Sequence, residues 1–229
     1  MEHHAPLTFL PALHIPGFTH SQVLVLEYTW LSMLIVILMT VAVAVSLKTV
    51  PGPFQNFFEM IVAFLEDYTA DIVGPKGLIY FPLIITVFLF VAVSNYMGLI
   101  PGCIAPTGDI NTTAGVAIVV FIFYQFVGFK HQGIKYLKKF LGPIPVMAPI
   151  MVVMELISEL ARPFSLSLRL FANILGGEMI IKLLSGMLMV GLPVIWMAWE
   201  SVLTAPIQAF VFSLLTMIYL AGAVTSEEH

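Results

Sequence analysis

The fold of this chain is decided by one stretch, ELISELARPFSLSLRLFANILGGEMIIK, residues 155–182. Six ionisable side chains interrupt its apolar background: Glu155, Glu159, Arg162, Arg169, Glu178 and Lys182. A charge at the centre of a bilayer costs from roughly 3 kcal/mol to more than about 10 kcal/mol, so such side chains normally face a partner or a water-filled path. We therefore expect this stretch to be both membrane-embedded and functional.

Helical spacing places Arg169 on a face of small and polar residues. At about 100° per residue, several positions fall within about 60° of it: Ser158, Arg162, Ser165, Ala172, Asn173 and Gly176. Small residues let another membrane helix approach closely, so the spacing predicts a contact face that carries a permanent positive charge. Glu178 lies about 180° away on a regular helix, so the two charges are predicted to face in different directions.

The composition is that of a polytopic membrane protein. Of the 229 residues, 60% are hydrophobic and only 10% are charged, and the mean hydropathy is +1.03. These values exclude an ordinary soluble domain, and we expect a single membrane domain over residues 1–229. The net charge of −4 argues against a nucleic-acid partner, which would need a basic surface.

No chemistry of small-molecule conversion is evident in the sequence. Cys103 and the histidines near the N-terminus follow no metal-ligand spacing, so we expect neither a metal nor a cofactor. Gly176-Gly177 is followed by an acid rather than by the Lys-Ser or Lys-Thr of a phosphate-binding loop. Any nucleotide chemistry must then belong to a partner, and the chain itself is predicted not to be an enzyme.

Apolar runs predict five membrane-spanning helices. A span needs about 20 residues to cross a hydrocarbon core of roughly 30 Å. The predicted spans are residues 28–47, 78–100, 114–129, 145–190 and 194–224. The last two form a hairpin with its turn at Gly191-Leu192-Pro193. Residues 145–190 would measure about 68 Å as one helix, so this helix is expected to tilt steeply, to break at Pro163 or Gly176-Gly177, or both.

A sixth helix, residues 54–73, is predicted to lie along the membrane surface. Its acids, Glu59, Glu66, Asp67 and Asp71, alternate with apolar residues at helical spacing, and four acids disfavour a span. Such a helix docks on lipid or on another protein. The expected fold is an all-α polytopic membrane protein with five transmembrane helices, one amphipathic interfacial helix and a long tilted C-terminal helical hairpin.

Charge also predicts the orientation. Lys130, Lys135, Lys138 and Lys139 follow the third span, and short basic loops stay in the cytoplasm. Residues 1–26 contain no Lys or Arg and are predicted to lie outside the cytoplasm. Counting five spans from an outside start places the C-terminus in the cytoplasm, as in the plasma membrane of a bacterium.

The last helix has a polar stripe of its own. Ser201, Thr204 and Tyr219 lie within roughly 40° of Gln208, and Glu200 flanks the stripe. The hairpin therefore carries polar groups on both arms. An arginine stays charged at any physiological pH and cannot relay protons, but it can attract a mobile carboxylate and keep it ionised. If aqueous half-channels reach its two sides from opposite faces of the membrane, a passing carboxylate loads from one and unloads to the other.

RPFSLSLRLFANILGGE, residues 162–178, closely resembles the signature of the a subunit of rotary F-type ATP synthases. The resemblance extends over essentially the whole chain and includes residues 95–101, PTGDINTT (106–113) and TAPIQAFVFSLLTMIYL (204–220). It implies a stator that couples proton flow to rotation of a carboxylate-bearing ring of c subunits. The implied partners are this c-ring, the peripheral-stalk b subunit, the soluble catalytic head and the lipid bilayer.

The resemblance also implies roles for individual residues. Arg169 resembles the essential stator arginine that separates the half-channels, and Asn173 and Gln208 resemble its polar neighbours. Glu178 and Glu155 resemble acids that line the half-channels.

Two positions depart from the family pattern. Seven residues before the glutamine, where members often carry His or Glu, this chain has Ser201, with Glu200 one step away. Lys182 stands where the family is typically apolar, and it could pair with Glu178 at a spacing of four residues.

A second class of function remains open on the sequence alone. A self-contained proton- or sodium-coupled secondary transporter would also carry intramembrane charges, with its substrate site near the midplane. It would transport substrate as a purified protein, whereas a stator subunit would transport nothing without its ring.

Overall fold

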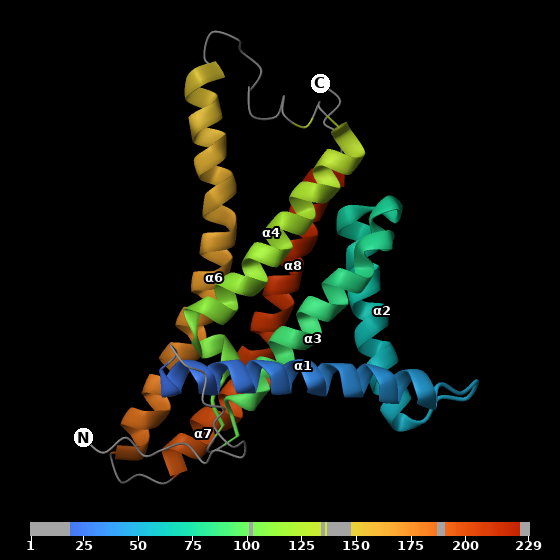
Figure 1. Cartoon of the computed structure of the whole chain (residues 1–229). Helices are drawn as coiled ribbons and strands as arrows, with labels where there is room; N and C mark the ends of the chain where they lie inside the picture. The colour runs from blue at the N-terminus through green and yellow to red at the C-terminus, as the bar shows by residue number, and fades with distance from the viewer. Residues whose placement is uncertain (1–18, 101–102, 134–135, 137–147, 187–190, 225–229) are drawn as a thin grey trace.

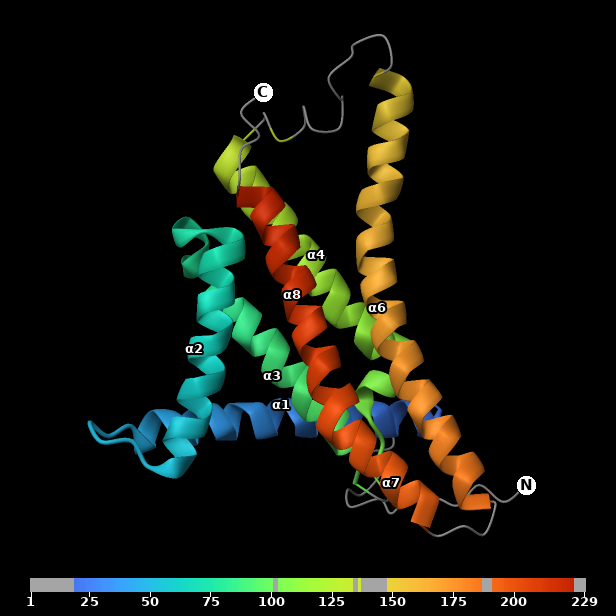
Figure 2. The same ribbon diagram turned by 180° about the vertical axis from the view of Figure 1, so that it is seen from behind.

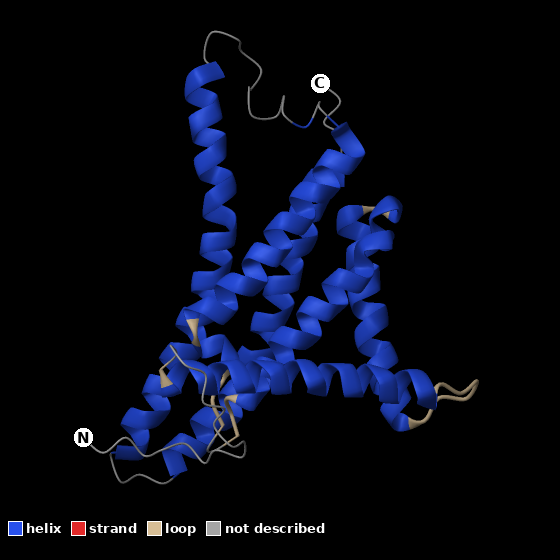
Figure 3. Cartoon of the chain, viewed as in Figure 1, coloured by secondary structure: helices blue, strands red, loops and turns tan. Residues whose placement is uncertain are grey.

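The computed structural model describes residues 19–100, 103–133, 136, 148–186 and 191–224. The predicted N-terminal segment up to residue 18, Lys135, Lys138, Lys139 and the C-terminal residues 225–229 lie outside these ranges. All regular secondary structure in the described residues is helical (Figure 3). The elements are α1 (His20–Ser46), α2 (Pro53–Val73), η1 (Pro75–Tyr80), α3 (Phe81–Met97), η2 (Pro106–Gly108), α4 (Ile110–Gln132), α6 (Ala148–Gly186), α7 (Gly191–Trp199), η5 (Glu200–Thr204) and α8 (Ala205–Val224).

Five helical stretches of the described chain are long and apolar enough to cross a membrane. They are His20–Ser46, Gly77–Met97, Ile110–Gln132, Ile150–Gly186 and Gly191–Val224, and one predicted span lies on each. The predicted all-α polytopic fold is therefore confirmed. The boundaries differ where a cap decides them: α4 begins four residues before its predicted start because the Asp109 carboxylate accepts a hydrogen bond from the Asn111 backbone N–H at 2.7 Å.

The helices do not run parallel to one another. α1 lies across the direction of α2 and of the first half of α6, while α3, α4 and α8 cross the molecule obliquely (Figures 1 and 2). If α1 crosses the bilayer along its normal, α2 and much of α6 run along the membrane. This arrangement supports the interfacial position of residues 54–73 and the tilt of the hairpin, both of which stay predictions.

The centre of the molecule is formed by α3, α4 and α8. α8 packs against α3, α4 and α2, and α4 also packs against α6. The contact faces of α3 and α8 include small buried residues, Ser94, Ala209 and Ser213. Since lipid is as apolar as a leucine side chain, close packing through such small residues drives helix association in membranes. Larger buried side chains complete the core, among them Ile84, Val91, Val120, Leu170, Phe212 and Leu220.

The structure excludes a break in the long helix, which was one of the predicted alternatives, and the predicted turn of the hairpin is wrong. α6 runs unbroken through Pro163 and Gly176-Gly177 over 39 residues, about 58 Å, and it bends gently instead of breaking (Figure 2). A proline inside a helix removes one backbone hydrogen bond and crowds the preceding turn, which a bend can accommodate. Gly191-Leu192-Pro193 form the first turn of α7 and not a loop, because proline is tolerated in the first turn of a helix.

Candidate functional site

Arg169 lies on an uncovered face of α6. Its side chain is exposed, and it makes no hydrogen bond or ion pair with any residue that the structure describes. Leu166 and Leu170, on either side of it in sequence, are buried and anchor α6 to the rest of the chain. The predicted small-residue face around it is also uncovered at Ser165 and Ala172. The described part of the fold thus presents this guanidinium outward and gives it no partner.

One turn further along α6, the two arms of the hairpin are joined by a hydrogen bond. The Asn173 Nδ2 donates to Gln208 Oε1 at 2.8 Å. Gln208 is 6% exposed, so the bond is largely sheltered, whereas Asn173 is exposed on the side of Arg169. The sequence prediction that Asn173 and Gln208 lie together beside Arg169 is consistent with this contact.

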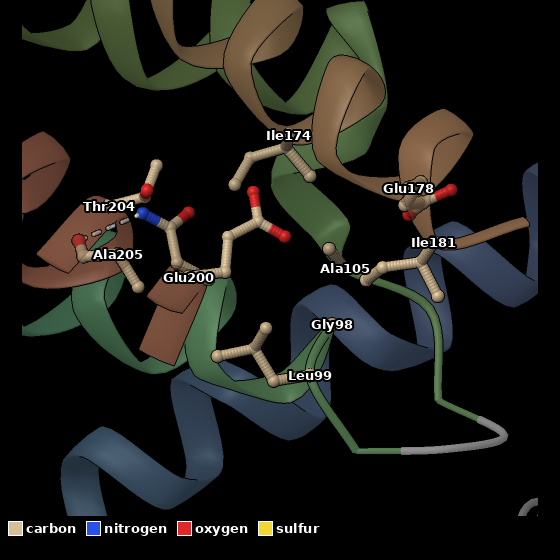
Figure 4. A pocket seen from close by; sticks show the side chains of 10 residues that line it. Gly98, Leu99, Ala105, Ile174, Glu178, Ile181, Glu200, Thr204 and Ala205 are labelled. Carbon is tan, nitrogen blue, oxygen red and sulfur yellow. Dashed lines mark hydrogen bonds between the residues drawn. The ribbon is translucent and has the colours of Figure 1, made fainter. Parts of the chain in front are cut away.

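Glu178 and Glu200 line one small cavity between the arms of the hairpin and the α3–α4 connection (Figure 4). The centre of a water molecule can occupy about 20 Å³ of this cavity, which is enough space for one water. Leu99, Ala105, Ile174 and Thr204 form other parts of its wall. Figure 4 shows the Glu200 carboxylate beside Ile174, with Glu178 further along α6.

Glu200 is the more enclosed of the two acids. It is 8% exposed, and its carboxylate makes no hydrogen bond or ion pair with any described residue. It packs against Gly177, where a Cβ atom would collide with the carboxylate oxygens. Glycine at this position is therefore what allows the acid of the last helix to approach α6.

Ser201 is not brought into this cavity. Its Oγ donates to the backbone C=O of Met197 at 2.7 Å, and its own C=O accepts from the Tyr96 hydroxyl at 2.9 Å. The predicted stripe that joined Ser201 to Gln208 on a regular helix is wrong, because residues 200–204 form a wider π-helical turn, η5. The sequence left Glu200 and Ser201 as alternatives, and only Glu200 lines the cavity.

Asn95 lines the same cavity. The Thr107 hydroxyl donates to Asn95 Oδ1 at 2.8 Å, and Asn95 Nδ2 contacts the Ala205 C=O at 3.4 Å. Asn95 is 2% exposed. Its amide thus joins α3, the segment before α4 and the start of α8 in the wall of the cavity that the two acids line.

Glu178 forms an ion pair with Lys182 on the exposed surface of α6. The Lys182 Nζ lies 3.3 Å from Glu178 Oε2, with side-chain exposures of 75% and 30%. The pair predicted from the spacing is confirmed. Exposed pairs of this kind contribute about 0–1 kcal/mol, so Lys182 holds the acid only weakly.

A second polar cluster surrounds Glu159, which is 1% exposed. Its carboxylate accepts from the Tyr124 hydroxyl at 2.7 Å and from Gln125 Nε2 at 3.1 Å, and it lies 3.3 Å from Arg162 Nη1. Glu159 and Arg162 thus pair at a separation of three residues, which places two side chains on the same face of a helix. The Arg162 guanidinium also lies over the Tyr219 ring, 5.3 Å from its centroid.

Tyr136 completes this cluster from beyond the end of α4. Its hydroxyl donates to Gln125 Oε1 at 2.8 Å, and its ring lies against Gly128, where a Cβ atom would meet it at 2.5 Å. Burial raises the pKa of Tyr136 to about 12, so the hydroxyl stays a hydrogen-bond donor at physiological pH. The cluster therefore ties α4, α6 and α8 together. Glu155 lies one turn before it, half-buried, and away from the Glu178–Glu200 cavity.

Comparison with known proteins places this geometry in a family. A family model described as ATP synthase A chain matches residues 26–221. The chain belongs to this family. ATP synthase subunit a 3 of Pelobacter propionicus is 47% identical over 217 residues, which cover 94% of this chain and 92% of the relative. The ATP synthase subunits a of Geobacter sp. strain M21 and Geobacter sulfurreducens are each 44% identical, covering 94% and 87% of this chain and 94% and 86% of their own lengths.

Membership in the ATP synthase A chain family identifies the chain as a membrane-sector subunit of an F-type ATP synthase. With five helices able to span a membrane and bacterial relatives, it is a multi-pass bacterial membrane protein that works in a complex with other subunits. The resemblance drawn from residues 162–178 is thereby confirmed.

Residue spacing in the sequence does not predict some of the residues that complete these polar clusters in this member of the A-chain family. Tyr124, Gln125 and Tyr136 come from segments far from Glu159 in sequence and follow no motif with it. Two adjacent polar residues such as Tyr124-Gln125 within an apolar span were a usable signal, since intramembrane polar groups form hydrogen bonds with partners. Asn95 carried the same signal near the end of its span.

Proposed function

We propose that this chain is the proton-translocating stator subunit of its ATP synthase, in which Arg169 separates two aqueous half-channels that serve the carboxylates of the c-ring. The observation that carries the proposal is the exposed Arg169 guanidinium, which has no hydrogen-bond or ion-pair partner among the residues that the structure describes. A charge in an apolar setting needs a counter-charge or water. On an outward face of α6, that counter-charge comes from another subunit.

The surroundings of Arg169 suit an apolar rotating partner. Leu160, Phe164 and Leu168 are exposed on the same helix, and Ser165 and Ala172 leave room for a second helix to approach. A ring carboxyl group crosses lipid in its neutral form. Beside the guanidinium the ionised form is favoured, so the carboxyl releases its proton there and takes up another after it has passed.

The Glu178–Glu200 cavity is the inner part of one half-channel. Two carboxylates, a hydroxyl from Thr204 and the Asn95 amide line a space for one water, which gives a proton a hydrogen-bonded path through the hairpin. Glu155, on the other side of Arg169 in sequence, belongs to the second half-channel. The b subunit and the soluble head hold the stator against the ring's torque. In this arrangement the N-terminus lies outside the cytoplasm and the C-terminus lies in it.

The energetics suffice for this role. One charge that crosses 100 mV is worth about 2.3 kcal/mol, so several steps of the ring supply enough free energy for one chemical synthesis by the head. The a subunit contributes no catalytic group to that synthesis.

The decisive experiment compares Arg169→Ala with the parent in inverted membrane vesicles. We expect ATP-driven acidification to fall below about a tenth of the parental rate, because each ring carboxyl would lose an attraction of several kcal/mol in a low-dielectric setting. Passive proton leak, followed in parallel, should rise if the arginine is the barrier between the half-channels. Immunoblots of the assembled complex control for loss of the subunit.

Pumping at the parental rate by Arg169→Ala would overturn the role of this residue. Transport of a substrate by the purified subunit alone, reconstituted without a ring, would instead favour the secondary-transporter alternative.

A further inference from the structure

The π-helical turn η5, Glu200–Thr204, decides which residue of the last helix faces α6. On a regular helix Ser201, seven residues before Gln208, would lie within about 20° of it, and Glu200 would lie about 80° away. The Ala205 N–H bonds to the Glu200 C=O, five residues back instead of four. The turn thus contains one extra residue, which rotates everything before it by about 100°.

Pro206 supplies the physical cause of this turn. Its ring nitrogen has no hydrogen to donate, and on a regular α-helix the ring would clash with the C=O of the residue four positions earlier, Val202. A wider turn moves that carbonyl away from the ring. Val202 is 70% exposed, so the extra residue bulges outward without disturbing the core.

α6 leaves room for the Glu200 side chain that this turn directs toward it. Gly177 offers the Glu200 carboxylate a place that any side chain would fill, and Glu200 is buried there without a hydrogen-bond partner among the described residues. Ser201 is turned away and satisfied by Met197. α7, which the turn rotates, contains no buried residue, so its rotation with the register of η5 removes no side chain from the core.

We propose that Pro206, through the π-helical turn before it, is the positioning residue that presents Glu200 rather than Ser201 to Gly177 and Glu178 of α6. The positioning is a matter of geometry; its consequence for ion transfer rests on the function proposed above.

The first test measures the register directly by disulfide cross-linking in assembled complexes in native membranes. All variants carry Cys103→Ser. One pairs Gly177→Cys with Glu200→Cys; the matched control pairs Gly177→Cys with Ser201→Cys and adds Glu200→Ala, so that no carboxylate crowds position 177. Because a disulfide needs Cβ atoms about 3.5–4.5 Å apart, we expect about tenfold more cross-link for 177 with 200 than for 177 with 201. Equal yields, or the reverse order, would overturn the proposal.

The second test is a cycle of four chains assayed for ATP-driven pumping: the parent, Pro206→Ala, the exchange Glu200→Ser with Ser201→Glu, and the combination of all three substitutions. Without the proline the helix can become regular, and position 201 then faces α6. Each partial change therefore moves the carboxylate out of register, and pumping should fall below about a tenth, while the combination should restore at least about half of it. Loss in the combination equal to that of the exchange alone would overturn the role of Pro206.

The two tests separate the positioning from the function. Cross-links in the expected register together with equal pumping by all four chains would leave the positioning standing and overturn the part of Glu200 in ion transfer. Glu200→Asp provides the conservative control, since it keeps the carboxylate near Gly177 and should retain more pumping than Glu200→Gln.

Discussion

Arg162 and Arg169 lie two turns apart on one face of α6, and their surroundings are opposite. Arg162 is partly buried, pairs with Glu159 at 3.3 Å and covers the ring of Tyr219. Arg169 is exposed and meets none of the described residues in a hydrogen bond or ion pair. Identical side chains at equivalent helical positions thus differ in their surroundings: Arg162 is held by contacts within the chain, whereas Arg169 is exposed, as the function proposed above requires of it.

Glu159 and Glu200 differ in the same way, one having partners within the described chain and the other having none there. The Glu159 carboxylate receives two hydrogen bonds and an ion pair, whereas Glu200 is nearly as buried and receives none from the described residues. A buried charge with a full set of partners is stable in one state. A buried acid with no fixed partner is free to exchange a proton with a water beside it.

Giving Arg169 an internal partner should remove the contrast and produce the largest effect. Ser165→Glu places a carboxylate four residues before Arg169, the favourable order for an ion pair on a helix. We expect pumping to fall below about a tenth, because a local counter-charge competes with the ring carboxylates for the guanidinium. Ser165→Gln is the control of equal size and should pump at close to the parental rate. Unchanged pumping by Ser165→Glu would contradict the need for an unpaired Arg169.

Breaking the polar cluster around Glu159 should lower the stability of the subunit before it affects pumping. Glu159→Ala leaves Arg162 without its counter-charge, and removing one partner of a buried pair costs about 3–5 kcal/mol. The subunit should leave the purified complex at a clearly lower temperature, as followed by native gels after heating. Glu159→Gln keeps an acceptor for Tyr124 and should be milder. A complex with Glu159→Ala that is as heat-stable as the parent would show that the cluster does not hold α6.

The hydrogen bond between the hairpin arms should matter less. Asn173→Ala removes the donor to Gln208, and single hydrogen bonds between membrane helices average about 0.6 kcal/mol. We expect a small loss of heat stability and a partial loss of pumping, measured in the same vesicles. Asn173→Asp tests the geometry, since its carboxylate cannot donate to Gln208 Oε1 and would also face Arg169.

The outer ion pair should contribute least. Lys182 is 75% exposed, and such pairs are worth about 0–1 kcal/mol, so Lys182→Ala should change pumping less than about twofold. The check is to compare the pumping rates of Lys182→Ala and the parent at low and at high salt. Salt screens an exposed ion pair, so any difference between the two chains that comes from the pair should shrink at high salt. A large loss would mean that Lys182 acts on the half-channel itself and not merely on Glu178.

Local spacing accounts for what the sequence predicted well. The five spans follow from apolar length, and the Glu159–Arg162 and Glu178–Lys182 pairs follow from separations of three and four residues on one helix. These depend on neighbours in the chain and on the regular rise and turn of an α-helix. The residue-by-residue roles in ion transfer stay predictions.

The sequence left open, or misplaced, the points at which a helix departs from regularity or responds to another helix. α6 continues through Pro163, since a bend costs less than ending a helix whose backbone groups would face lipid. Ser201 was placed beside Gln208 by counting along a regular helix, but the π-helical turn η5 adds a residue between them. Neither outcome can be read from periodicity, which assumes a constant turn.

By itself, the sequence determined that this is a helical membrane protein, where its helices run, and which arginine lacks a local acid, because these depend on composition and on spacing within one helix. Only the tertiary structure decided that Tyr124, Gln125 and Tyr136 complete the site of Glu159, and that Glu200 reaches Gly177. Those contacts join residues distant in sequence. They depend on how helices cross and rotate against one another, and no local period encodes that relation.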